Sequence, residues 1–240
     1  MSQILSIQEL IELTGDRVRA AGDAGGGGGG GGMFELETEH ILQVHVDGHV
    51  WIKAGGMIAY RGEMKFEREG LLSQGLGTLL KKAVSGEGAS LTKAQGRGHL
   101  FLADKGKRVT LLELKNEQIF VNGSDLLCIE PRVKHEIVMM KKVSAIMSGG
   151  LFNVRLTGPG IIAITTHHRA LSLPVTPEQP VFTDPQATVA WSGTLRPELR
   201  TDIQLKSLIG RGSGESFQMR FQGHGFVLVQ PYEEHPLQAD

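Results

Sequence analysis

Gly96-Arg97-Gly98 stands directly before the run His99-Leu100-Phe101-Leu102, and this pattern decides the fold because it occurs three times. The second copy is Gly158-Pro159-Gly160 before Ile161-Ile162-Ala163-Ile164. The third is Gly223-His224-Gly225 before Phe226-Val227-Leu228-Val229. Each glycine pair leads into residues of the types that favour β-strands. Three such copies predict a unit that is repeated along the chain.

Further shared elements accompany the three glycine pairs. A Ser-Gly marker precedes each pair, at Ser85-Gly86, Ser148-Gly149 and Ser213-Gly214. A second apolar element occurs at residues 57–60, 126–129 and 188–191. Alternating apolar and polar residues at 152–155 and 217–220 have the period of two that is typical of strands. We therefore predict an internal triplication of an all-β unit.

The positions of these elements relative to the chain ends predict a closed ring. Residues 33–60 carry the second apolar element with no Gly-x-Gly before it, and residues 213–232 carry Gly-x-Gly with no second element after it. The two ends complete one unit only if they meet in space. This indicates double-stranded β-helix or sandwich-like units around a pseudo-threefold axis, a closure that hides strand edges. A linear array would need capping repeats instead.

Composition favours a soluble cytoplasmic protein. The chain of 240 residues contains 33 glycines and few aromatic residues, which is typical of many tight turns between short strands. Its formal net charge of −1 gives no reason to expect binding to nucleic acid, which needs clustered Lys and Arg. The single cysteine, Cys128, lies in an apolar run, so we expect a buried, unreactive thiol. No apolar stretch approaches the roughly 20 residues that span a bilayer.

The chain divides into three parts. Residues 1–24 form a predicted N-terminal helical extension, residues 25–32 a polyglycine linker, and residues 33–235 the triplicated β domain. Ile4, Ile7 and Ile11 have helical spacing, whereas eight consecutive glycines should behave as flexible coil. Three fates of the helix stay open: it folds back onto the β domain, it docks on another subunit or protein, or it is a frayed tail.

Local signals predict the turns of the β domain. Asp47-Gly48 lies between two apolar runs and indicates a hairpin. Lys115-Asn116-Glu117 separates two further strands, and Asn122-Gly123 offers another turn. Each Gly-x-Gly is predicted to form a tight turn whose second glycine has a positive φ.

The stretches before the Ser-Gly markers combine large apolar residues with basic ones. One interpretation is that the apolar residues cover the ends of the units while the lysines face water. The other is that they form a contact surface for a membrane or a partner protein. The candidate contact residues are Leu79, Leu80, Lys81, Lys82, Met139, Met140, Lys141, Lys142, Leu205, Lys206 and Arg211.

No pattern in the sequence indicates catalysis. His45 and His49 straddle a predicted turn, and the adjacent His167 and His168 would point to opposite faces of a strand, so the histidines predict no metal site. Ser-Gly-Glu lacks the context of a hydrolase nucleophile, and Gly-x-Gly leads into a strand rather than the helix of a dinucleotide site. We predict no catalytic residues, no metal and no cofactor, and hence no enzyme.

Several motifs in order carry a resemblance to a known family. They are Met33-Phe34-Glu35-Leu36, the stretch from Trp51 to Tyr60, Gly149-Gly150-Leu151-Phe152-Asn153, Ala187-Thr188-Val189-Ala190-Trp191, and residues 212–216 with 223–231. Over about residues 33–234 the chain resembles the bacterial branch of the altered inheritance of mitochondria protein 24 family. This resemblance implies a fold similar to the tryptophan RNA-binding attenuation protein. Mitochondrial members are linked to the organisation of the inner membrane and its protein complexes, and the family supplies no catalytic residue to carry over.

These observations lead to an expected function. We expect a non-enzymatic, self-associating scaffold or binding protein that acts near a membrane or membrane-protein complex, at the inner face of the membrane. Three similar contact segments on one body would add modest contacts through effective concentration. The alternative is a small-molecule or RNA binding module that uses the attenuation-protein-like fold. The expected partners are further copies of the chain and a membrane surface or membrane-protein complex; nucleic acid is not expected, and no small-molecule ligand is identified.

Overall fold

Strands make up almost all of the regular structure. The computed structural model describes residues 4–12, 32–68, 91–139, 152–201 and 217–233. In these residues one short α-helix and one 3-10 turn accompany the strands, which confirms the all-β fold class. Most of the candidate contact residues lie outside the described residues: Leu79, Leu80, Lys81, Lys82, Met140, Lys141, Lys142, Leu205, Lys206 and Arg211.

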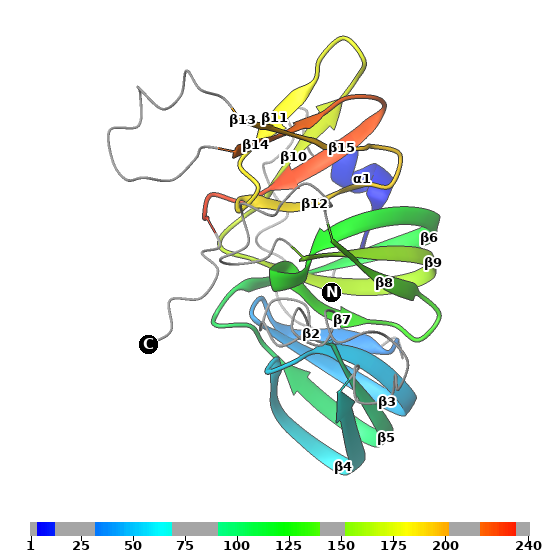
Figure 1. Ribbon diagram of the computed structural model, residues 1–240. Helices are drawn as coiled ribbons and strands as arrows, with labels where there is room; N and C mark the ends of the chain where they lie inside the picture. Colours follow the sequence, from blue (N-terminus) through cyan, green and yellow to red (C-terminus); the bar gives the residue numbers. More distant parts are fainter. Residues whose placement is uncertain (1–3, 13–31, 69–90, 140–151, 202–216, 234–240) are drawn as a thin grey trace, which may run out of the picture.

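The strands form three successive groups, which are stacked one above another in Figure 1 from blue and cyan at the bottom to yellow and red at the top. The first group contains β2 (Phe34–Thr38), β3 (Ile41–Lys53), β4 (Met57–Arg68) and β5 (Leu91–Leu102). The second contains β6 (Arg108–Asn122), the 3-10 helix η1 (Gly123–Asp125), β7 (Leu126–Ile129), β8 (Lys134–Met139) and β9 (Phe152–Thr166). The third contains β10 (Leu171–Val175), β11 (Val181–Thr183), β12 (Thr188–Ser192), β13 (Glu198–Thr201), β14 (Phe217–Phe221) and β15 (Gly225–Val229).

One sheet of 12 strands connects the three groups. Its main path runs β10-β15-β12-β6-β9-β7-β3-β5-β4, with β1 (Ile4–Ser6), β2 and β8 paired beside it, and β11-β14-β13 form a separate sheet. Among the described strands this path is open, with β10 and β4 at its ends, so the predicted closure into a ring is wrong as far as their pairing is concerned. The reason lies in where the unit was taken to begin. If the unit is taken to begin at Met57, each of the elements at 57–60, 126–129 and 188–191 is followed by a Gly-x-Gly within the same strand group. Neither chain end then holds half a unit. The threefold repetition itself stays a prediction.

The first two Gly-x-Gly copies are not turns, contrary to the prediction. Gly96-Arg97-Gly98 lies within β5 and Gly158-Pro159-Gly160 lies within β9. The second glycine does have positive φ in both copies, +157° at Gly98 and +143° at Gly160. A Cβ atom at Gly98 would lie 2.1 Å from the carbonyl oxygen of Arg61 on β4. Glycine is therefore required because two strands approach closely, while the strand itself continues through the motif. In the third group the motif connects β14 to β15.

Two other turn predictions are also corrected. β3 runs without a break through Asp47-Gly48, where Gly48 has φ +120° and is paired with Gly96. β6 runs through Lys115-Asn116-Glu117, where its register against β9 shifts as in a β-bulge. The turn at Asn122-Gly123 is confirmed, since η1 begins there and the Asn122 side chain accepts a hydrogen bond from the Ser124 amide at 3.0 Å.

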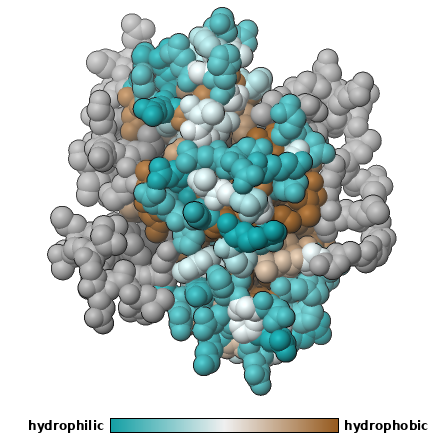
Figure 2. All heavy atoms as spheres, turned by 90° about the vertical axis from the view of Figure 1, so that its right-hand side faces the viewer, coloured by the Kyte–Doolittle hydropathy of each residue, from teal (hydrophilic) through white to brown (hydrophobic). Residues whose placement is uncertain are grey.

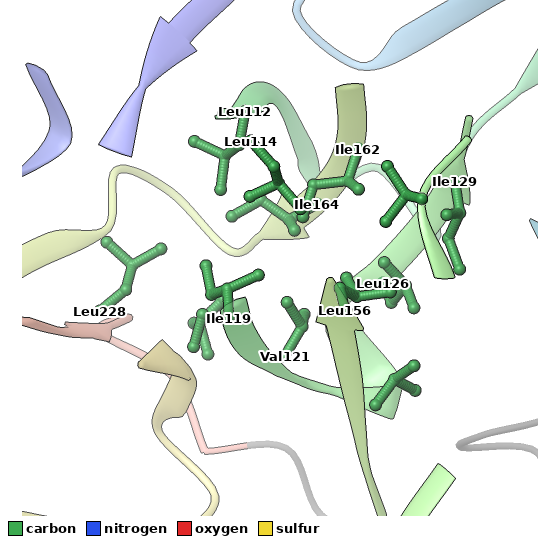
Figure 3. Packing of buried hydrophobic residues seen from close by; sticks show 14 of the residues in the cluster. Leu112, Leu114, Ile119, Val121, Leu126, Ile129, Leu156, Ile162, Ile164 and Leu228 are labelled. Atoms are coloured by element: carbon green, nitrogen blue, oxygen red, sulfur yellow. The ribbon is translucent and has the colours of Figure 1, made fainter. Parts of the chain in front are cut away.

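Strand β6 is buried on both faces and joins the first group to the second. Leu111 packs in a cluster with residues of β3 and β5, whereas its neighbour Leu112 packs in a cluster with Ile162 and Ile164 of β9. Figure 3 shows the second of these clusters from close by. A smaller third cluster fills the third group around Trp191 and Phe221. Because successive side chains of a strand point to opposite faces, neighbouring residues of β6 contribute to two different hydrophobic clusters.

The N-terminal segment folds back onto the β domain, which is one of the three fates left open by the sequence. Residues 4–6 form strand β1 (Ile4–Ser6), which pairs in parallel with Leu111–Glu113 of β6. Helix α1 (Ile7–Glu12) follows, and Ile7 is buried in the core cluster of β6 and β9. The Ser6 hydroxyl accepts a hydrogen bond from the Glu9 amide, and the Glu9 carboxylate accepts one from the Ser6 amide. This reciprocal capping explains why the helix begins at Ile7.

Candidate functional site

The predicted contact segments connect equivalent pairs of strands. Residues 69–90 join β4 to β5, residues 140–151 join β8 to β9, and residues 202–216 join β13 to β14. In each case the two strands are antiparallel neighbours. Met139 is the last residue of β8 and is paired with Phe152; the other ten candidates lie outside the described residues. Each of the three strand groups therefore presents one candidate segment at the same kind of connection.

The strands that flank these connections carry charged residues. Arg155 donates to Glu136 across β9 and β8, and both Arg200 and Arg220 lie near Glu198 on β13. Surface ion pairs of this kind contribute little to stability. They make the surface beside these connections polar but do not hold the strands together strongly. The face that forms the right-hand side of Figure 1 is largely hydrophilic at its top and bottom, and hydrophobic residues gather around its middle (Figure 2).

An open groove of about 540 Å³ lies between the second and third groups. Its apolar lining includes Phe120 of β6 and Trp191 of β12, whose rings stack with centroids 5.4 Å apart. Arg196 and Arg200 also line it. The groove therefore combines a stacked aromatic pair with guanidinium groups. The remaining lining residues are Val138, Asn153, Leu195, Pro197, Glu198 and Leu199.

A buried ionic cluster lies where the first and second groups meet. The side chains of Lys107 and Asp125 are 3% and 0% exposed, and Lys107 Nζ lies 3.0 Å from Asp125 Oδ1. Lys53 Nζ donates to Asp104 Oδ2 at 2.8 Å and to the carbonyl oxygen of Ser124 at 2.6 Å. Because such charges are costly to bury unless each is paired, this cluster fixes the relative position of the two groups.

Neutral groups extend the cluster to the second and third groups. The Thr165 hydroxyl donates to Asp104 Oδ2 at 2.8 Å, and Gln230 Nε2 donates to Asp125 Oδ1 at 3.3 Å. The other end of the Gln230 amide accepts a hydrogen bond from the His167 amide. Residues from all three groups thus share one hydrogen-bonded network.

The network changes the acidity of Asp104. Burial by itself raises the pKa of this carboxyl, but the charge and hydrogen bond of Lys53, the charge of Lys107 and the hydrogen bond from Thr165 together outweigh burial. The pKa of Asp104 therefore lies below its usual range, and the carboxylate stays ionised at neutral pH. Sequence reasoning missed this cluster because its members are far apart along the chain. The only local signal was the spacing of Asp104 and Lys107 in the short connection between two strands.

The histidines and the cysteine occupy structural surroundings. The rings of His45 and His99 meet edge to face on β3 and β5, and His167 stacks on Tyr232. Burial, together with the charge of Lys93, lowers the pKa of His49. No group of three His, Cys, Asp or Glu side chains that could hold a metal ion occurs within the described ranges. Cys128 is fully buried, and burial raises the pKa of its thiol far above the usual range, as expected for an unreactive cysteine.

Comparison with known proteins identifies the family. The family model described as Mitochondrial biogenesis AIM24 matches residues 34–232. The chain belongs to the AIM24 family. This confirms the family resemblance noted in the sequence, while the likeness to the tryptophan RNA-binding attenuation protein stays a prediction.

A solved structure supports the same fold for this AIM24 chain. It is the crystal structure of protein SPYM3_0169 from Streptococcus pyogenes, which superposes with a TM-score of 0.65 at 22% sequence identity. The match covers 83% of this chain and 92% of the streptococcal chain. At this identity the likeness concerns the fold alone. A search of the curated proteins found no match.

Among the described residues of this AIM24 chain, no helix is both long and apolar enough to cross a membrane.

Proposed function

We propose that this AIM24 protein is a non-enzymatic, self-associating scaffold or binding protein that acts near a membrane or membrane-protein complex. The observation that carries the proposal is the repeated placement of the candidate segments. Each group contributes one apolar and basic segment between two antiparallel strands, β4 and β5, β8 and β9, or β13 and β14. Membership in a family described by mitochondrial biogenesis supports a binding or scaffold role over a catalytic one.

A body with three similar contact segments binds an extended surface more strongly than one segment can. The network of Lys53, Asp104, Lys107, Asp125 and Gln230 holds the three groups together. Fixed spacing gives the second and third contacts a high effective concentration once the first is made. Lysines beside apolar residues suit an anionic lipid surface, where each contributes about 1 kcal/mol.

Liposome co-sedimentation tests this role. The protein is incubated with vesicles of neutral lipid alone and with vesicles that contain an anionic lipid, at low and high salt. We expect binding that requires the anionic lipid and falls with salt, because screening shortens the reach of the lysine charges. Failure to sediment with either vesicle at low salt would contradict a membrane-surface role and direct the search to a protein partner.

Matched variants locate the contact. Lys141→Glu with Lys142→Glu, and Lys81→Glu with Lys82→Glu, are expected to weaken sedimentation with anionic vesicles. The control is Lys105→Glu with Lys115→Glu, which makes the same change of charge at two exposed residues on other parts of the chain. Equal losses in the control and in the test variants would indicate that only net charge matters and would exclude the proposed segments.

The groove between the second and third groups supports a second candidate function, a module that binds a small molecule or RNA. The stacked rings of Phe120 and Trp191, with Arg196 and Arg200 beside them, suit a planar ring that carries an anionic group. Titration with a nucleoside monophosphate and with a short single-stranded RNA, followed by tryptophan fluorescence, tests this. A saturable change that is lost in Arg196→Ala with Arg200→Ala would favour the groove function over the scaffold.

A further inference from the structure

Strand β4 has a free edge in the part of the chain that the structure describes. β5 is its only strand partner there, and β4 ends the main path of the sheet, at the bottom of Figure 1. Most of its residues are exposed. A long strand at the edge of a sheet presents unpaired backbone N–H and C=O groups, which can pair with another strand.

The side chains on one face of β4 alternate in charge. They are Arg61, Glu63, Lys65 and Glu67, all exposed. None of the four forms an ion pair with another described residue, although Arg61 lies over the ring of Phe101 at 5.8 Å. Charged residues on an edge strand usually prevent pairing between copies because like charges meet. With alternating signs the outcome depends on the register instead.

One antiparallel register turns all of these charges into attractions. If two copies of β4 are related by a twofold axis through Met64, Arg61 lies opposite Glu67 of the second copy and Glu63 lies opposite its Lys65. A shift of the axis to Glu63 would place Arg61 opposite Lys65 and Glu63 opposite itself. A shift to Lys65 would place Glu63 opposite Glu67. Opposite charges directly across a strand pair stabilise it and like charges destabilise it, so the Met64 register is selected.

The neighbouring strand extends the same pattern. On β5, Arg97 is paired with Glu63 and Lys93 is paired with Glu67. In the Met64 register each of these two carboxylates therefore lies between two cations, one from β5 and one from the second copy. On the opposite face of β4, Gly62 lies across from Phe66 of the second copy, where a glycine leaves room for an aromatic ring.

We propose that the AIM24 chain forms a twofold dimer by antiparallel pairing of β4 with β4 of a second copy, in the register centred on Met64. This inference rests on the self-association in the proposed function and gives it a surface. Pairing would join the main sheets of the two copies into one continuous sheet and hide the exposed edge. Strands β8 and β13, which precede the other two candidate segments, take no part in this pairing.

Charge variants test the pairing of the β4 edges in solution. Glu63→Lys with Glu67→Lys makes the edge wholly basic, and Arg61→Glu with Lys65→Glu makes it wholly acidic. Each variant alone is expected to dimerise at least tenfold more weakly than the native chain, which is roughly 1.4 kcal/mol. An equimolar mixture should recover the dimer, because every pair across the axis then has opposite signs. Sedimentation velocity measures all four samples.

The possible outcomes separate the surface from the wider proposal. A native chain that remains monomeric at about 100 µM in low salt would refute both the β4 dimer and self-association. A native dimer that neither charge variant weakens would refute the β4 pairing alone and leave self-association through another surface. Weakening in both variants without recovery in the mixture would refute pairing of the β4 edges through opposite charges.

A cysteine cross-link tests the geometry independently. Residues directly opposite in an antiparallel pair have Cα atoms about 4.5 to 5.5 Å apart, which fits a disulfide. Met64→Cys should therefore cross-link to itself in the dimer under a mild oxidant. Ile58→Cys is the control, since its exposed side chain on the same strand would lie about 40 Å from its copy. Cys128 is buried and should not react. Equal cross-linking of both variants would indicate random collision and overturn the register.

Discussion

Replacing Lys107 by methionine should destabilise the protein strongly. The side chain of Lys107 is almost fully buried, 3.0 Å from Asp125 and 3.6 Å from Asp104. Methionine fills similar space but removes the ammonium group that lies beside both buried carboxylates. Breaking a buried ion pair from one side costs about 3 to 5 kcal/mol. For a chain of this size, about 2 to 4 °C are lost for each kcal/mol, so the melting temperature should fall by roughly 6 to 20 °C.

The assay is urea denaturation followed by circular dichroism at pH 7, with native protein, Lys107→Met, Asp125→Asn and the double variant. Asp125→Asn alone should cost less, because Lys107 keeps Asp104 and the carbonyl oxygen of Ser124 within reach. The double variant should lose less than the sum of the single variants, since neither charge of the pair is then left alone. A loss below about 1 kcal/mol for Lys107→Met, or strict additivity, would refute the view that this cluster locks the strand groups together.

Three further predictions follow from the described residues. The pKa of Asp104 is lowered in the folded protein, so its contribution to stability is present above the unfolded pKa and is lost as pH falls through the lower folded value. Asp104→Asn should therefore reduce the acid-induced loss of stability below about pH 4, measured as the free energy of unfolding across pH. An unchanged dependence on pH in this variant would contradict the lowered pKa of Asp104. Ile7→Ala should destabilise by about 2 kcal/mol because Ile7 is buried against the core, whereas a wild-type melting temperature in this variant would mean that the N-terminal segment is not docked in solution. Gly98→Ala should lower the free energy of unfolding by more than about 3 kcal/mol, because its Cβ would meet a backbone oxygen at 2.1 Å. The control Gly106→Ala has a positive φ but no atom within 4 Å of the added Cβ, so it should cost about 1 kcal/mol. Similar losses of stability in both variants would argue against the close approach of β4 and β5.

The class of the fold could be predicted from sequence, but the course of individual strands could not. Alternating residues and abundant glycine indicate strands because these properties act locally. Asp47-Gly48 carries the same local signal as a hairpin turn, yet β3 continues through it because Gly48 faces Gly96 on β5. The partner strand lies 48 residues further along the chain, and no local pattern reports its register. The first two Gly-x-Gly motifs lie within strands rather than turns for the same reason.

The buried network illustrates a second limit. Lys53 donates to Asp104 and to the backbone of Ser124, contacts that span 51 and 71 residues of sequence. Nothing in the residues around Lys53 distinguishes it from a lysine that faces water. By contrast, the burial of Cys128 was predictable, since its apolar neighbours belong to a short strand with all four residues buried. The family motifs were recognisable because they occur in order over the whole β domain.

The pairing of β1 with β6 imposes an order on how the protein can assemble during synthesis. Ile4–Ser6 are synthesised more than 100 residues before their partners Leu111–Glu113. Until then Ile4 and Ile7 have no native strand or core to join. A nascent chain thus carries these apolar residues without their partners through the synthesis of its entire first group of strands. Completion of the core requires a segment that was made long before its partners, and a bulky fusion ahead of that segment would have to let it return.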